Sequence, residues 1–339
     1  MIYREERDVT KDLKQDYLEG LNRVIEQRQR EAAEQRSEYI KEILRDPDGR
    51  RQEFLAALGW PLVGHTDAAP PEVTLTELSR EEGYTLYRAG IRVLPGLTMQ
   101  GLLFKLDGEE RRPLVIVQHG WLGTPEFISG VYGGTANYND MLQRTLKQGV
   151  HAFAPQLLMW AEDYGVPFDR RQIDGKLKRL GSSVTAVEIY GIMRALDYFE
   201  TRPYVSTFGM LGLSYGGFFS LVTPAAEPRI KAAIAGSFFG QRDAHFSPEW
   251  TWFDSGRRFD DAEWAALIYP RKLWIQMGDE DWLYKNTRTE EAYEELVKGC
   301  EEVGTDWVKY LIFHGVHEYA WDDGPIAGLV EELHRWENT

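Results

Sequence analysis

The first 60 residues have the hydrophobic pattern of helices. Between Leu13 and Ile25, apolar residues recur at steps of three and four, and nearly half of the positions up to residue 53 are charged, with both signs interspersed. This spacing predicts an apolar stripe along a solvated helix or helix pair. The Asp-Pro-Asp-Gly sequence at 46–49 is a strong breaker, and a short helix should follow over 50–58. We therefore expect a helical extension over residues 1–60, packed either on its own domain or against another subunit.

The rest of the chain alternates between strand and helix patterns. Residues 73–106 have period-two hydrophobicity, which predicts antiparallel strands. Beyond them, uninterrupted apolar runs of strand length cover residues 113–118, 150–155, 207–213, 230–236, 272–278 and 307–313. Helical patterns separate several of these runs, over residues 138–148, 182–200, 286–303 and 326–336. This alternation predicts an α/β fold with a doubly wound, mostly parallel sheet.

Two long segments without a clear period interrupt that alternation. They span residues 156–181 and 237–264 and are rich in aromatic side chains. Long irregular loops inside a compact domain are usually functional. We therefore expect one catalytic domain over residues 61–339, with lid-like insertions at these two places.

Composition excludes several classes of partner. The 339-residue chain has a formal net charge of −15, which argues against nucleic acid or an anionic membrane surface, since both are polyanions. A single cysteine, Cys300, permits no intramolecular disulfide. No apolar run approaches the length of a membrane span, and the first residues lack the apolar core of a signal peptide. We expect a cytoplasmic protein.

The strongest candidate for chemistry is a serine after the apolar run at 207–213. Gly212-Leu213-Ser214-Tyr215-Gly216 matches the pattern G-x-S-x-G, and apolar residues at helical spacing follow it. In such a turn between strand and helix, the glycines allow close approach and the serine hydroxyl is exposed. The motif alone is weak, because a tight turn also satisfies it.

A nucleophilic serine needs a base, and the base needs an orienting carboxylate. The predicted strand that ends at Gly278 is followed by Asp279 and Asp281, and the strand that ends at Phe313 is followed by His314 and His317. The candidates therefore follow the strand ends where sites form in open α/β sheets. Their order along the chain is Ser, Asp, His, as an α/β-hydrolase requires.

These motifs, together with Gln118-His119-Gly120, resemble the α/β-hydrolases of the dienelactone-hydrolase, acetyl-xylan-esterase and prolyl-oligopeptidase-like group. The resemblance covers residue 84 to the C-terminus. It implies Ser214 as nucleophile, His317 as base and Asp281 as the orienting acid, since the group has Gly-x-x-Asp and Gly-x-His at these places. It further implies the backbone N–H groups of Tyr215 and Trp121 as oxyanion donors, and a structural role for His119.

Other roles for these residues remain open. Asp279 is the alternative triad acid, and His314 is more simply a structural residue at the strand end. A metal site at His314, His317 and Glu318 is disfavoured because the helix-borne H-E-x-x-H pattern is absent. We expect no metal and no cofactor.

The aromatic residues of the predicted loops suggest the substrate. Trp121, Tyr132, Trp160, Tyr164, Trp250 and Trp252 follow or lie between predicted strands, and aromatic faces suit sugar rings or aryl groups. Of these, Tyr132, Trp160, Trp250 and Trp252 are our candidates for a substrate pocket. The alternative is that most of them pack on one another.

The sequence thus predicts a serine carboxylester hydrolase for a small soluble ester, with an acetylated sugar favoured. The alternatives with the same triad are a prolyl-oligopeptidase-like peptidase, which would need a propeller that some 80 residues cannot form, and a C–C bond or lactone hydrolase. A non-enzyme alternative is a silent scaffold that assembles through its N-terminal helices. The same helices make a homo-oligomer possible.

Overall fold

The structure is a computed structural model that describes residues 2–64, 69–159, 168–245 and 247–337. The described residues form one nine-stranded sheet in the order β1-β2-β3-β5-β4-β6-β7-β8-β9. The strands are β1 (Val73–Glu81), β2 (Tyr84–Leu94), β3 (Leu97–Leu106), β4 (Arg112–Gln118), β5 (His151–Pro155), β6 (Val205–Leu213), β7 (Ile230–Gly236), β8 (Lys272–Gly278) and β9 (Val308–Phe313). Strands β1, β2 and β3 pair antiparallel, and β3 pairs antiparallel with β5. The remaining neighbours, β5-β4-β6-β7-β8-β9, all pair parallel. The predicted mostly parallel α/β sheet is confirmed.

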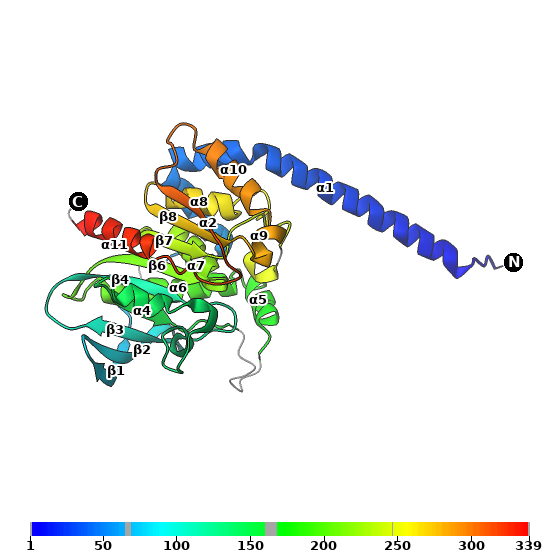
Figure 1. Ribbon diagram of the computed structural model, residues 1–339. Helices are drawn as coiled ribbons and strands as arrows, with labels where there is room; N and C mark the ends of the chain where they lie inside the picture. The colour runs from blue at the N-terminus through cyan, green and yellow to red at the C-terminus, as the bar shows by residue number, and fades with distance from the viewer. Residues whose placement is uncertain (1, 65–68, 160–167, 246, 338–339) are drawn as a thin grey trace.

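Helices cover both faces of this sheet (Figure 1). They are α1 (Arg7–Arg45), α2 (Pro47–Leu58), α3 (Pro125–Ile128), α4 (Met141–Leu146), α5 (Arg170–Lys178), α6 (Val184–Phe199), α7 (Tyr215–Ala226), α8 (Asp261–Ile268), α9 (Trp282–Asn286), α10 (Thr289–Gly299) and α11 (Gly324–Glu337), with 3₁₀ turns η2 (Ala136–Tyr138) and η4 (Pro248–Trp250). Alternate residues of β4 face opposite cores: Leu114 and Ile116 pack with α6 and α7, Val115 and Val117 with α4 and α11.

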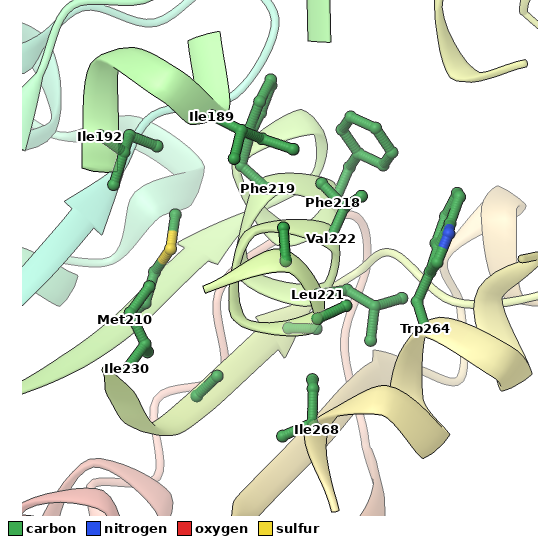
Figure 2. Packing of buried hydrophobic residues seen from close by; sticks show 14 of the residues in the cluster. Ile189, Ile192, Met210, Phe218, Phe219, Leu221, Val222, Ile230, Trp264 and Ile268 are labelled. Atoms are coloured by element: carbon green, nitrogen blue, oxygen red, sulfur yellow. The ribbon is translucent and has the colours of Figure 1, made fainter. Parts of the chain in front are cut away.

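The larger core lies under α7, the helix that begins at the serine turn. Figure 2 shows Phe218 and Val222 of α7 between Ile189 of α6 and Trp264 of α8. All twelve residues of α7 are buried. The helix is therefore enclosed by other elements, which fixes the position of the turn that precedes it.

The N-terminal region is a long helix followed by a short one. α1 packs through its C-terminal third, where Ile40, Ile43 and Leu44 are buried in the core against α8 and α10. Its N-terminal part projects away from the sheet (Figure 1). The Asp-Pro-Asp-Gly sequence does separate two helices, but α2 begins at Pro47 and not at residue 50, because the Asp46 side chain caps the helix by accepting from the Gly49 amide.

The two irregular segments were only partly predicted correctly. Within residues 156–181, α5 forms a helix capped by Asp169, whose carboxylate accepts from the Gln172 amide. Residues 160–167 of this segment lie outside the described part of the chain. In the second segment, Trp264 belongs to α8 and is fully buried, so it is a core residue and not part of a loop. Within the described residues, no helix has the length and apolar character needed to span a bilayer.

Candidate active site

Ser214 occupies a strained turn between β6 and α7. Its backbone has φ 60° and ψ −121°, a conformation that residues other than glycine rarely adopt, and its N–H donates to the Gly236 carbonyl at 2.8 Å. The flanking glycines are required by close contacts. A Cβ on Gly216 would lie 2.2 Å from the Gln118 carbonyl oxygen, and one on Gly212 would lie 2.5 Å from that of Gly216. The G-x-S-x-G pattern thus reflects close packing of β4 against the start of α7.

Asp281 and His317 meet at the same edge of the sheet. The Asp281 Oδ2 atom lies 2.8 Å from His317 Nδ1, and the Asp281 side chain is fully buried while His317 is partly exposed. Asp281 Oδ1 accepts from the Leu283 amide at 2.8 Å and caps α9. The carboxylate therefore holds the imidazole with a proton on Nδ1, which leaves Nε2 available as an acceptor.

The other acid and histidine form a separate pair. Asp279 Oδ1 lies 3.2 Å from His314 Nδ1 and also accepts from the Gly315 amide at 3.1 Å. The His314 side chain is 83% exposed and pairs with Asp279 just after the end of β9. The Asp279 carboxylate that bonds to it holds the pKa of His314 above its usual value. This geometry favours Asp281 over Asp279 as the partner of His317.

The loop that carries His317 is held from both sides. Asn137 donates from its side chain to the His317 carbonyl at 3.0 Å and accepts the Tyr319 amide at its own carbonyl at 2.9 Å. On the other side, the Ser237 hydroxyl donates to the Glu318 carbonyl at 3.3 Å. Ser237 directly follows Gly236, which accepts the Ser214 amide. The end of β7 therefore touches both the serine turn and the histidine loop.

The segment after β4 lies against Ser214. A Cβ on Gly120 would come within 3.3 Å of the Ser214 Cβ atom, and the Gly120 amide donates to the Tyr138 hydroxyl at 2.8 Å. The next residue, Trp121, places its ring 5.6 Å from that of Tyr215. Among the described residues, neither the Trp121 nor the Tyr215 amide has a hydrogen-bond acceptor. Both of these amides, one beside Ser214 in the chain and one beside Gly120, therefore lack an acceptor among the described residues.

The buried His119 ring holds the segment after β4 in place through two hydrogen bonds to the backbone. Its Nδ1–H donates to the Gly120 carbonyl at 3.0 Å, and Nε2 accepts from the Leu157 amide at 3.2 Å. Its complete burial lowers the pKa to about 4, so the ring is neutral at neutral pH. Both ring nitrogens are occupied by backbone groups, which fits a structural role and not that of a second base.

An ion pair that the sequence did not reveal fixes Tyr215. Arg170 donates from Nε to the Tyr215 hydroxyl at 3.1 Å and from Nη1 to Glu188 at 2.9 Å, and both charged side chains are buried. Glu188 also accepts from the Leu158 amide at 2.7 Å. Arg170 comes from α5, in a segment that we predicted to be irregular, so its place beside the serine turn had no sequence signal.

The predicted pocket residues lie in different surroundings. Trp250 is buried with its ring 5.5 Å from that of Tyr215, whereas Trp252 packs against Phe54 and Trp264 beneath α2. Tyr132 is mostly exposed. Trp160, and Tyr164 of the same segment, lie outside the described residues. Of the three candidates within the described residues, only Trp250 is placed next to the serine turn.

Two residues near His317 were missed. The half-exposed Trp282 has its ring 6.5 Å from that of His317, and the His245 ring lies 5.4 Å from Trp282 and 5.2 Å from Trp250. Together these side chains form a row from His317 to Trp250. The position of Trp282 directly after Asp281 was the available signal.

A cavity of about 810 Å³ lies on the far side of Trp250. It is lined by α1, by α10 and by residues 241–243 and 250–260, among them Trp250, Trp252 and Arg242. Ser214 and His317 do not line it. In the described part of the chain, no three His, Cys, Asp or Glu side chains are grouped as metal ligands would be.

Solved structures of esterases share this fold. A Bacteroides fragilis protein that has been assigned as an acetyl xylan esterase aligns with a TM-score of 0.61 and 18% identity, over 82% of this chain and 81% of that one. A glucuronoyl esterase from Solibacter usitatus gives 0.58 and 16%, over 84% and 91%. Acetyl xylan esterase 1 from a Thermoanaerobacterium species gives 0.54 and 16%, over 85% and 93%. At these identities the likeness establishes the fold.

The sequence itself matches a family model. The model of the dienelactone hydrolase family matches residues 99–299, which is more than half of the chain and includes Ser214 and Asp281. A comparison with curated protein sequences gives no significant match. The chain therefore belongs to the dienelactone hydrolase family and is a hydrolase that acts on ester bonds.

Proposed function

We propose that the protein is a serine carboxylester hydrolase that cleaves small soluble esters through an acyl-enzyme, with an acetylated sugar as its substrate. The observation that carries the proposal is the hydrogen bond between buried Asp281 and His317, at the sheet edge where Ser214 occupies its strained turn. A carboxylate that holds Nδ1–H prepares Nε2 to take the serine proton. Ser214, His317 and Asp281 then act as nucleophile, base and orienting acid.

In the first half-reaction, the Ser214 hydroxyl oxygen attacks the carbonyl carbon of the ester and its proton passes to His317 Nε2. The carbonyl oxygen becomes an oxyanion, and in this proposal the backbone N–H groups of Tyr215 and Trp121 stabilise it. The tetrahedral intermediate collapses when the C–O bond to the alcohol breaks. His317 gives its proton to the leaving alkoxide, so that the alcohol departs and Ser214 is acylated.

In the second half-reaction, water takes the place of the alcohol. His317 Nε2 accepts a proton from the water as its oxygen attacks the acyl carbon, and the same two amides stabilise the oxyanion. Collapse of the intermediate returns the proton to Ser214 and releases the carboxylic acid. Asp281 stays ionised and orients the imidazole throughout.

Three observations support a neutral sugar ester. The row formed by Trp250, His245 and Trp282 places aromatic surface between Tyr215 and His317, and aromatic faces suit sugar rings. The structural relatives include two proteins described as acetyl xylan esterases, which are named for the removal of acetyl groups from a sugar polymer. A chain with a net charge of −15 is also better suited to a neutral ester than to an anionic one.

The decisive experiment compares hydrolysis of p-nitrophenyl acetate and of a peracetylated xylose oligosaccharide by the wild type and by Ser214→Ala. We expect the wild type to cleave both and the variant to lose about 10⁴-fold or more in kcat on each. The matched control is Ser206→Ala, at the start of β6 on the opposite edge of the sheet, which should retain activity. If Ser214→Ala retained activity, the triad would be wrong.

The same assays separate the alternatives. Cleavage of p-nitrophenyl acetate without release of acetate from the sugar would leave the esterase but refute the sugar substrate. Preferential opening of an aryl lactone or cleavage of a prolyl peptide would support the lactone hydrolase or the peptidase. A folded wild type that neither hydrolyses any ester nor reacts with a fluorophosphonate would support the silent scaffold.

A further inference from the structure

The N-terminal part of α1 is a helix without support from the rest of the protein. α1 is 39 residues long, which corresponds to about 58 Å, and its buried residues all lie from Ala32 onward. The part before Ala32 projects from the body (Figure 1). In proteins most helical stability comes from the packing of an amphipathic face and less from helix propensity. A partner that packs against this part of α1 would therefore stabilise it.

The projecting part carries an exposed apolar stripe. Val9, Leu13, Tyr17, Leu21 and Ile25 follow one another at steps of four and are all exposed, Tyr17 to 76% and Leu13 to 62%. Leu18 and Val24 widen the stripe around its middle. A contiguous exposed apolar surface of this kind marks an interaction site.

The stripe is symmetric about Tyr17. Leucines stand four residues before and after it, at Leu13 and Leu21, and β-branched residues stand eight before and after it, at Val9 and Ile25. A two-fold interface brings the same surface of two subunits together, so it must be complementary to itself. We propose that a second copy of this chain covers the stripe, with two α1 helices packed antiparallel around Tyr17.

The overall charge of this segment argues against other partners. Residues 4–31 carry seven Lys or Arg and eight Asp or Glu, a net charge of −1, whereas the whole chain has −15. A helix that binds an anionic bilayer is rich in Lys and Arg on its polar face. The nearly neutral segment is the part of an acidic protein at which a second acidic copy can approach with little repulsion.

The first test is the mass in solution by light scattering or sedimentation equilibrium at tens of micromolar protein. We expect the wild type at twice the 39.1 kDa of one chain and the variant Leu13→Lys/Leu21→Lys at 39.1 kDa. The matched control, Gln15→Lys/Asn22→Lys, adds the same charge to the opposite face of the helix and should remain dimeric. Helical content and hydrolysis of p-nitrophenyl acetate check that each variant is folded.

The second test locates the two-fold axis by oxidation of an introduced cysteine. Tyr17→Cys should form a disulfide-linked dimer, whereas Gln15→Cys on the opposite face should not, and the native Cys300 is buried and should not interfere. A monomeric wild type, a stripe variant that stays dimeric, or equal cross-linking of both cysteine variants would overturn the proposal. So would a monomer whose stripe instead binds vesicles of phosphatidylglycerol.

Discussion

The carboxylate of Asp281 serves two elements at once. Its Oδ2 atom accepts from His317 Nδ1 at 2.8 Å, and its Oδ1 atom accepts from the Leu283 amide at 2.8 Å, which caps α9. The side chain is completely buried, so both bonds are shielded from water. The orientation of the imidazole is thereby tied to the start of a helix.

This double role predicts how Asp281→Asn behaves. Asparagine is as good a helix cap as aspartate, so the melting temperature should change little. If the asparagine NH₂ group faces His317, it favours the wrong tautomer, with the proton on Nε2. In either orientation asparagine carries no charge, so it no longer stabilises the imidazolium. We expect kcat on p-nitrophenyl acetate to fall by about 10⁴-fold.

Asp279→Asn is the matched control, because Asp279 bonds to exposed His314 and not to His317. Its kcat should stay within about threefold of the wild type, since exposed pairs contribute little. The reverse ranking of the two variants would identify Asp279 as the triad acid.

Close packing at the serine turn predicts a cost for Gly216→Ala. The new Cβ would lie 2.2 Å from the Gln118 carbonyl and 2.9 Å from that of His119, and both are backbone atoms that cannot rotate away. Overpacking of this kind costs about 1–3 kcal/mol of unfolding free energy. Displacement of the neighbouring amides should lower kcat by roughly 100-fold.

Gly175→Ala tests whether any alanine in place of a helical glycine has this effect. Gly175 lies in α5, and nothing comes within 4 Å of an added Cβ. Alanine there should raise the free energy of unfolding by up to about 1 kcal/mol and leave kcat unchanged. Similar losses in both variants would contradict our account of the turn.

Substitutions of the buried ion pair Arg170–Glu188 should have non-additive effects on the free energy of unfolding. Arg170→Met leaves the Glu188 carboxylate buried without its partner, which should cost about 3–5 kcal/mol of unfolding free energy. Adding Glu188→Gln removes that charge but keeps an acceptor for the Leu158 amide. The double variant should therefore be more stable than Arg170→Met alone in urea unfolding. A double variant that loses the sum of both single effects would contradict this coupling.

The sequence predicted the sheet and the chain order of the triad because both depend on local patterns. Strand β7 (Ile230–Gly236) and strand β8 (Lys272–Gly278) have the predicted bounds, since short apolar runs bounded by turns are strong signals. Parallel strands then bring Ser214, Asp281 and His317 to one edge.

What the sequence did not reveal depends on contacts between distant segments. Arg170 reaches Tyr215 from 45 positions away, and neither residue has a periodicity that predicts the contact. Trp252 resembled Trp250 in the sequence, yet it turns toward Phe54 of α2 while Trp250 turns toward Tyr215. Packing between distant segments decides which aromatic side chain of a loop faces the site. The spacing of residues in the sequence does not predict it.

Acid should weaken the fold through His151, which is buried away from the candidate site. Its Nδ1 atom accepts from the Leu106 amide at 3.0 Å and its Nε2–H donates to the Tyr204 carbonyl at 3.1 Å. Burial, with Lys105 and Arg112 nearby, lowers the pKa of His151 to about 4. The unfolded chain takes up this proton near pH 6.5, as a free imidazole does, whereas the folded protein does not until about pH 4.

Because the unfolded state binds more protons between these two values, His151 lowers the free energy of unfolding as the pH falls from about 6.5 to 4. We expect the advantage of the wild type over His151→Gln to shrink by about 2 kcal/mol between pH 7.5 and pH 4.5, since glutamine does not titrate. Urea unfolding of both proteins at the two pH values measures this difference, and the other titrating groups cancel because both chains share them. A difference that stays constant with pH would show that His151 titrates alike in the folded and unfolded states.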